Sequence, residues 1–346
     1  MFLRTLTMLL ASATLIQSSI AGYALSDDYS GNHFFNGFHF FTDPDPTDGF
    51  VKYHDFDAAV SQSLIGMVSR ENNSIYLGVD TNTTLTAGVK PGRASVRLQS
   101  VKTFNHGLFI ADILHIPFAC GAWPAMWLLG QQTWPQGGEI DIVEGVNAAN
   151  NNSMTLHTNA GCSIQSTGYS GTASTTNCDV KDAKQPENAG CGISSPDTIS
   201  FGADFNANRG GVYATEWTSQ AIKIWFFPRA KIPQDIESGT PNPSGWGQPT
   251  AQFAGSCNID QHFQNHNLIF NTAFCGQWAG RVWKDSSCAA KAPTCEEFVA
   301  KNPKEMLEAY WLIRSVRVYE DKPAAKVVRG VDWRKMFADG EERRRV

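Results

Sequence analysis

The chain has 346 residues, of which 42% are hydrophobic and 18% are charged, so it is long enough to bury a large core in one or two domains. Its formal net charge is −5, and no run of basic residues occurs before the last few positions. Nucleic acid and anionic membranes are therefore excluded as favoured partners.

The N-terminal segment has the pattern of an export signal. Arg4 provides a positive charge, residues 6–16 form a largely apolar run, and small residues end at Ala21. The run is too short to span a membrane. We expect residues 1–21 to be a signal peptide, with cleavage after Ala21 or Ala24, and the mature protein to be secreted and extracellular. The alternative is an ordinary amphipathic first helix.

Export changes the interpretation of the cysteines and of the asparagine sequons. Eight cysteines in an oxidising compartment suggest up to four disulfides, and the spacing lacks the paired CxxC of a structural zinc site. Eight cysteines allow 105 pairings, which leaves the pairing open. Three Asn-x-Ser/Thr sequons fit a secreted glycoprotein: Asn72, Asn82 and Asn151.

Short segments with the composition of β-strands follow one another along the chain, with almost no helical segments between them. Such a pattern predicts an all-β fold, an antiparallel sandwich or jelly roll, in a single domain over residues 22–320. The predicted strands lie at 75–80, 94–100, 107–116, 125–130, 139–144, 153–158, 199–205, 211–217, 221–227, 267–274 and 310–320.

Two long loops interrupt the strands, at residues 159–196 and 233–256, and loops of this length are often functional. The best helix candidate is 295–307, which Pro303 should break. Residues 321–346 lose the strand pattern and turn polar, so we interpret them as an appended tail without an assigned function.

The stretch GGEIDIVEGV (137–146) places three acids on one predicted strand: Glu139, Asp141 and Glu144. Side chains on a strand alternate between its two faces, so Glu139 and Asp141 share a face and Glu144 points the other way. One extra residue would return Glu144 to the face of Glu139, and a β-bulge supplies it. The sequence therefore predicts a bulge at or near Ile142–Val143.

The neighbouring segments place Trp123 and Trp127 just before this strand and His157 just after it. Sugars stack on indoles, and paired carboxylates roughly 5–5.5 Å apart perform retaining glycoside hydrolysis. The residues thus favour a glycosidase cleft. Two alternatives stay open: charges on a solvent-facing edge strand, and a non-catalytic sugar-binding site. The tryptophans and the histidine could also be core residues.

The motif GEIDIVEGVN resembles the active-site strand of family 16 glycoside hydrolases, in the E-x-D-x-x-E form of laminarinases. The segments AWPAMWLLG, MTLHT, IKIWFFPRAKIP, LIFNTAFCGQWAG and CEEFVAKNP also resemble fungal secreted endo-β-1,3(4)-glucanases. The resemblance covers roughly residues 25–320 in order, which is far more specific than one motif.

This resemblance implies a concanavalin A-like jelly roll of two curved antiparallel sheets, with a glucan cleft on the concave face. It implies retaining endo-hydrolysis of β-1,3 or β-1,4 bonds, with Glu139 as nucleophile, Glu144 as general acid/base and Asp141 as the residue that tunes the nucleophile. The cleft residues that it implies are Trp123, Trp127, His157, Trp278 and Arg97.

Trp278 is expected in an exposed loop, and the alternative for Arg97 is a surface ion pair. Gln277 departs from the family, where an aspartate is common before this tryptophan. We expect β-glucan as the partner, a monomer, no organic cofactor and no catalytic metal. A lectin-like glucan binder and a wall-remodelling transglycosylase are the alternative functions on the same fold.

Overall fold

The computed structural model of the protein describes residues 22–322, and Tyr23–Glu320 forms one compact unit. The predicted signal peptide lies outside the described residues, as does the predicted tail apart from its first two residues. No helix within 22–322 has the length and hydropathy that a membrane span requires.

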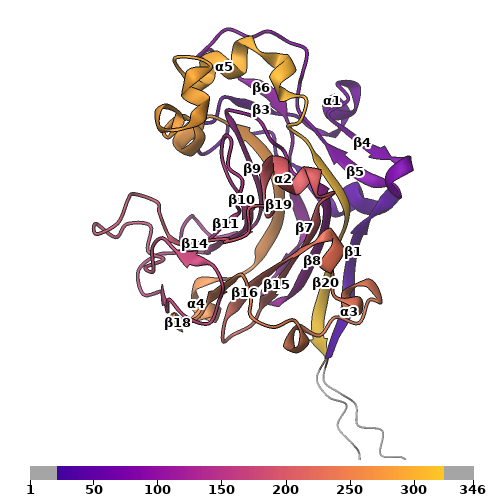
Figure 1. The fold of residues 1–346 in the computed structure, drawn as a ribbon, viewed down its shortest axis with the longest axis vertical. Helices are drawn as coiled ribbons and strands as arrows, with labels where there is room; N and C mark the ends of the chain where they lie inside the picture. Colours follow the sequence, from indigo (N-terminus) through magenta and orange to yellow (C-terminus); the bar gives the residue numbers. More distant parts are fainter. Residues whose placement is uncertain (1–21, 323–346) are drawn as a thin grey trace, which may run out of the picture. The chain divides into compact units, whose positions relative to one another are not determined.

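Two eight-stranded sheets form most of this unit (Figure 1). We call the first the back sheet, and its neighbouring strands run antiparallel along its path. Its order is β17 (Ala251–Phe253), β16 (Ile222–Pro228), β15 (Gly211–Trp217), β8 (Gly107–His115), β20 (Trp311–Lys322), β5 (Ser74–Leu77) and β4 (Ile65–Val68), with β1 (Gly22–Ser30) also paired to β20.

The second sheet, called the front sheet, is also antiparallel throughout. Its order is β13 (Thr172–Ala173), β14 (Cys191–Ser194), β11 (Ser153–His157), β10 (Glu139–Glu144), β9 (Ala122–Gly130), β19 (His266–Phe274), β7 (Arg97–Phe104) and β2 (Phe38–Phe40). Two small sheets pair β12 (Ser163–Ile164) with β18 (Gly255–Ser256), and β3 (Val51–Tyr53) with β6 (Arg93–Ser95).

The main core lies between the front and back sheets. Alternate residues of each strand point inward, as the two-residue period of a strand requires. Leu128 and Ile140 from the front sheet and Ile113 and Ile224 from the back sheet are fully buried in one hydrophobic cluster. These observations confirm the predicted all-β jelly-roll sandwich of antiparallel sheets.

One predicted strand is wrong: residues 199–205 do not pair in a sheet, and Gly202–Ala207 forms the helix α2. Apolar residues alternate along 199–205 as in a strand, and both Phe201, which is extended, and Phe205 in the helix are buried. The chain turns into the helix at Gly202, whose φ is +70° and where a Cβ would clash with the carbonyl oxygen of Ala149, so this turn overrides the alternation. The other predicted segments contain strand, although 94–100 divides between β6 and β7.

The predicted helix near the C-terminus is α5 (Cys295–Lys301), and Pro303 separates it from the 3₁₀ turn η8 (Pro303–Met306), as expected. The remaining helices are short. They are α1 (Phe56–Ser61), α3 (Gln234–Glu237), α4 (Ile259–His262), the π-helical turn η5 (Gly276–Gly280) and the 3₁₀ turns η1 (Gly31–Gly37), η2 (Ser69–Glu71), η3 (Arg229–Lys231), η4 (Pro243–Gly245), η6 (Trp283–Asp285) and η7 (Ser287–Ala290).

All eight cysteines form disulfides, which confirms the oxidised interpretation over a zinc site. The bridges are Cys120–Cys288, Cys162–Cys257, Cys178–Cys191 and Cys275–Cys295. Among the sequons, Asn72 and Asn82 are exposed, whereas Asn151 is half-buried and its Nδ2 donates to the carbonyl of Ser195 at 3.1 Å.

Candidate active site

Strand β10 contains the predicted bulge. Asp141 pairs with Trp127 of β9, but Val143 pairs with the very next residue, Met126, so Ile142 is the extra residue. On the other side, two residues of β10 stand opposite one of β11. Both Ile142 and Val143 are fully buried in the core, and the bulge at Ile142–Val143 is thereby confirmed.

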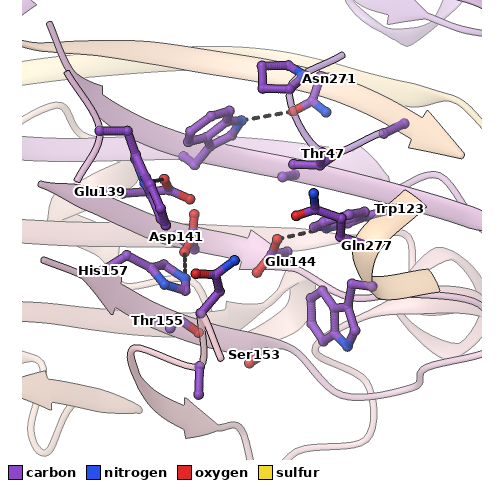
Figure 2. Close-up of a pocket in the computed structure, with 18 of the residues that line it drawn as sticks. Thr47, Trp123, Glu139, Asp141, Glu144, Ser153, Thr155, His157, Asn271 and Gln277 are labelled. Carbon is purple, nitrogen blue, oxygen red and sulfur yellow. Dashed lines mark hydrogen bonds and ion pairs between the residues drawn. The ribbon is translucent and has the colours of Figure 1, made fainter. Parts of the chain in front are cut away.

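The bulge brings the three acids into one cleft on the front sheet. Glu139, Asp141 and Glu144 all line a cavity of about 640 Å³ (Figure 2). Because β10 lies between β9 and β11, it is an interior strand. The alternative of a charged, solvent-facing edge strand is therefore wrong.

Two tryptophans from β9 stand beside the acids. Trp123 and Trp127 are half-buried and line the cleft, so the alternative of purely core residues is wrong. The indole nitrogen of Trp123 donates to Glu144 Oε1 at 2.8 Å (Figure 2). Trp278, predicted in an exposed loop, is half-buried in η5, with its ring centroid 5.7 Å from that of Trp123.

Arg97 also lines the cleft, and its residue is only 5% exposed. Its guanidinium carbon lies 4.4 Å from the centroid of Phe41 and 5.0 Å from that of Trp127, which is a cation–π arrangement. The alternative of a surface ion pair is therefore wrong. Trp127 is itself held by Asn271, whose Oδ1 accepts from the indole nitrogen at 2.8 Å.

His157 extends from β11 into the same cleft, which contradicts the alternative of a core histidine. Its Nε2 lies 3.2 Å from Asp141 Oδ2 (Figure 2). His157 stands opposite Glu139 in the strand register. The imidazole and the acids therefore form one contiguous polar group.

Trp134 is a cleft residue that the sequence reasoning missed. Its indole nitrogen donates to Glu139 Oε2 at 2.7 Å, its residue is 40% exposed, and it lines the cavity. It precedes Pro135 in the loop between β9 and β10. An aromatic residue in a turn directly before an acidic strand was the available signal.

Burial and neighbouring charge perturb two of the three acids. Burial raises the pKa of Asp141 well above its usual range, and the adjacent Glu139 raises it further by charge repulsion and hydrogen bonding. Burial also raises the pKa of Glu144, and the charge of Asp141 adds to this, whereas the hydrogen bond from Trp123 opposes it.

Replacing Asp141 with asparagine should stabilise the protein at neutral pH while it lowers turnover. A carboxyl whose pKa is raised by folding favours the folded state below its unfolded pKa, and this contribution is lost as the pH rises through the folded pKa. The introduced amide carries no charge to bury. We expect a higher Tm than wild type at pH 8, by roughly 2 °C for each kcal/mol gained, and a smaller difference at pH 4. Equal Tm differences between the variant and wild type at pH 8 and pH 4 would show that ionisation of Asp141 is not the cause.

One group of side chains within the described residues could hold a metal ion. The ligand atoms of Glu139, Asp141 and His157 lie within 4.8 Å of one another. Carboxylates and an imidazole are common ligands of divalent transition metals. That no metal takes part stays a prediction, and we expect full turnover after dialysis against EDTA. A loss that Zn²⁺ or Mn²⁺ restores would contradict it.

The loop at 159–196 forms one wall of the cleft through Ser174 and residues 186–189. The Cys178–Cys191 disulfide joins the two ends of the segment that contains residues 186–189. Gly190 has a φ of +58°, and a Cβ there would lie 2.8 Å from the Nδ1 of His157, so only glycine fits. The other long loop, 233–256, contributes no residue to the cavity, and its predicted functional role is not supported.

The family model that matches this chain is described as the XgeA-like, catalytic GH16 domain, and it matches residues 38–319. An endo-1,3(4)-beta-glucanase of Arthroderma benhamiae is 48% identical over 327 residues, which is 93% of this chain and 70% of that protein.

Two solved structures are similar in both sequence and fold. An elongating GH family 16 beta-1,3-glucosyltransferase is 44% identical, with a TM-score of 0.79, covering 86% of this chain and all of that one. Laminarinase 16A from Phanerochaete chrysosporium, with beta-glucans in donor and acceptor sites, is 42% identical, with a TM-score of 0.80, covering 87% of this chain and all of that one.

Proposed function

The chain belongs to glycoside hydrolase family 16, and from this membership we propose that it is a retaining endo-glucanase that cleaves internal β-1,3 or β-1,4 bonds of β-glucans. In this proposal Glu139 is the nucleophile and Glu144 is the general acid/base. Asp141 is a neighbour that tunes the reactivity of Glu139 as a nucleophile. Trp123, Trp127, Trp278, His157 and Arg97 bind the glucan.

The reaction proceeds in two displacements. The Glu139 carboxylate attacks the anomeric carbon while the glycosidic C–O bond breaks, and Glu144 gives its proton to the departing oxygen. Water then attacks the anomeric carbon of the glycosyl-enzyme. Glu144, now ionised, takes a proton from that water, and Glu139 is released as a carboxylate. The anomeric configuration is retained.

The observation that carries this proposal is the bulge of β10. It turns three acids of one strand toward a cleft lined by indoles, and one of them, Glu144, has a raised pKa. A proton donor needs a pKa near the working pH, because an ordinary glutamate would be ionised there. The arrangement therefore supports acid-assisted glycoside cleavage.

The direct test is the release of reducing sugar from laminarin and from barley glucan, followed by linkage analysis with defined oligosaccharides. We expect internal cleavage of at least one polymer, with a fast fall in viscosity. Binding to insoluble glucan without turnover at any pH would contradict the proposal and favour the lectin-like alternative.

Replacing Trp123 with phenylalanine should shift the alkaline limb of the kcat/KM profile to higher pH. Glu144 must be protonated, so activity falls as the pH rises through its pKa, and Trp123 donates the hydrogen bond that lowers this pKa. We expect a shift of roughly one pH unit, because such a bond to a charged group contributes about 1.5 kcal/mol.

The matched control for this pH shift is Trp127→Phe. Trp127 lies in the same cleft but donates to Asn271 rather than to an acid. Both variants should bind glucan less well, whereas the alkaline limb should move only for Trp123→Phe. If the alkaline limb of the kcat/KM profile does not move in either variant, the indole of Trp123 does not lower the pKa of Glu144.

A second candidate function is glucan transfer. The 44% identity to an elongating glucosyltransferase favours it, because the same glycosyl-enzyme can be attacked by a sugar hydroxyl instead of water. Incubation with laminari-oligosaccharides and sizing of the products separates the two. Products longer than the donor at low substrate concentration would favour transfer.

We also propose that the protein is exported and acts as a monomer. Four disulfides fit an oxidising compartment. The expected result is a protein recovered from the culture medium with a new N-terminus at residue 22 or 25, and the mass of a monomer in light scattering. Retention of Met1 in the mature protein would contradict export by cleavage.

A further inference from the structure

Asn152 is a fully buried amide next to the bulge of β10 that has no part in the mechanism above. Its Nδ2 donates to the carbonyl of Ile142 at 2.7 Å, and its Oδ1 accepts from the backbone N–H of Glu144 at 2.8 Å. These two backbone groups flank Val143, where the ladder between β10 and β11 is interrupted. The side chain therefore fills the gap that the bulge leaves in the ladder.

An amide makes both contacts at once without having to bind or release a proton. A peptide group of a neighbouring strand would offer one N–H and one C=O, and the side chain of Asn152 offers the same pair. Buried backbone groups without partners cost free energy, and a carboxylate in this place would face the carbonyl of Ile142 with a second oxygen. The bulge is thus stabilised by a side chain that imitates a peptide.

Asn152 is itself anchored to the segment that follows β14. Its backbone N–H donates to Ser200 Oγ at 2.9 Å, and its carbonyl accepts from the N–H of Ser195 at 2.9 Å. Ser200 Oγ in turn donates to the carbonyl of Asp197 at 2.6 Å. The backbone of Asn152 is therefore anchored by bonds outside β10, while its side-chain amide contacts β10.

Glu144 is consequently held at both ends. Asn152 holds its backbone N–H, and Trp123 holds its carboxylate at 2.8 Å. Proton transfer in a transition state depends on position, and a displacement of about 1 Å can cost about 100-fold in rate. A loose bulge would move Glu144 more than Glu139, because Glu139 lies on the regular side of the strand.

We propose that Asn152 is the positioning residue of the proton donor: it holds the bulge so that Glu144 protonates the leaving oxygen. This inference rests on the proposed function, in which Glu144 is the acid. Its signature is selectivity, since a misplaced acid impairs cleavage of sugar leaving groups but not of leaving groups that need no proton.

The test is Asn152→Asp with two substrates. On laminari-oligosaccharides, whose leaving group needs a proton, we expect kcat to fall about 100-fold. On dinitrophenyl β-laminaribioside, whose leaving group needs none, the first-turnover release of dinitrophenolate should fall less than about fivefold. Both rates are divided by the fraction of enzyme that a 2-fluoro-glycoside traps, so that misfolded protein is not counted.

The matched control is Asn151→Asp in the same host without N-glycosylation. Asn151 is the adjacent asparagine, but it contacts Ser195 rather than β10. We expect it to keep both rates within about threefold, as for a substitution away from the reacting groups. If Asn152→Asp does not fold, Ser200→Ala, which loosens the anchor of Asn152, should show the same selectivity with a loss of about tenfold.

Three outcomes are distinguishable. Unchanged oligosaccharide turnover in Asn152→Asp, or an equal loss on both substrates per trapped site, would overturn the role of Asn152. A selective loss would support it. Wild-type enzyme that cleaves neither substrate would overturn the proposed function itself.

Discussion

Replacing Glu139 with glutamine should reduce turnover of laminarin by about 10⁴-fold or more, because the reaction loses its nucleophile. Glutamine has nearly the same size, and its carbonyl oxygen can still accept the hydrogen bond from Trp134. We therefore expect an unchanged fold and glucan affinity within a few-fold of wild type. Reducing-sugar release and calorimetric binding of laminari-oligosaccharides measure the two effects.

The control for this loss is Glu237→Gln, an exposed glutamate on α3 outside the cleft, which should keep wild-type turnover. Azide distinguishes the two proposed roles. With Glu139→Ala, azide should attack an activated β-glycoside directly and yield the α-glycosyl azide. With Glu144→Ala, it should attack the glycosyl-enzyme and yield the β-product. The opposite pair of products would reverse the assignment, and wild-type rates in both glutamine variants would refute it.

Replacing Arg93 with methionine should destabilise the protein by about 3–5 kcal/mol without changing the chemistry of the cleft. Arg93 is fully buried on β6. Its guanidinium donates to the backbone carbonyls of Val299, Asp80 and Thr83, and lies 3.3 Å from the Asp80 carboxylate. Methionine fills much of the volume but leaves these acceptors without a donor.

Urea unfolding followed by tryptophan fluorescence measures this effect. The matched control is Arg70→Met on η2, where the arginine is exposed and the change should stay within about 0.5 kcal/mol. Turnover per active site should match wild type in both variants, because Arg93 does not line the cleft. A loss below about 1 kcal/mol for Arg93→Met would mean that water replaces the guanidinium at those carbonyls.

Much of the fold could be predicted because strand periodicity is a local property. Segments such as 211–217 and 221–227 form β15 and β16, and their β-branched and aromatic residues are typical of strands. The prediction for residues 199–205 was wrong although their apolar residues alternate as in a strand, because the backbone turns at Gly202 with a φ of +70° and continues as the helix α2. The bulge at Ile142–Val143 was predictable from parity alone, because three acids cannot share one face of a regular strand at this spacing.

Other parts of the site could not be predicted. Asn152 is one asparagine among several in NAANNNS, and nothing local separates it from Asn151. Only the fold places its amide against the open ladder of β10 and turns Asn151 toward Ser195 instead. The family resemblance selected Arg97 for the cleft, but only the tertiary structure shows that Arg93, four residues earlier, is fully buried.

The amino-acid sequence by itself thus determined the all-β class, the acidic strand with its bulge, and the even number of cysteines available for disulfides. Each of these follows from residue type and from a period of two, which neighbouring residues already express. The tertiary structure alone decided the disulfide partners, the indoles that donate to Glu139 and Glu144, and the amide that holds the bulge. Those contacts join segments that are distant along the chain or lie across a turn, and they depend on how two sheets pack, which no local period encodes.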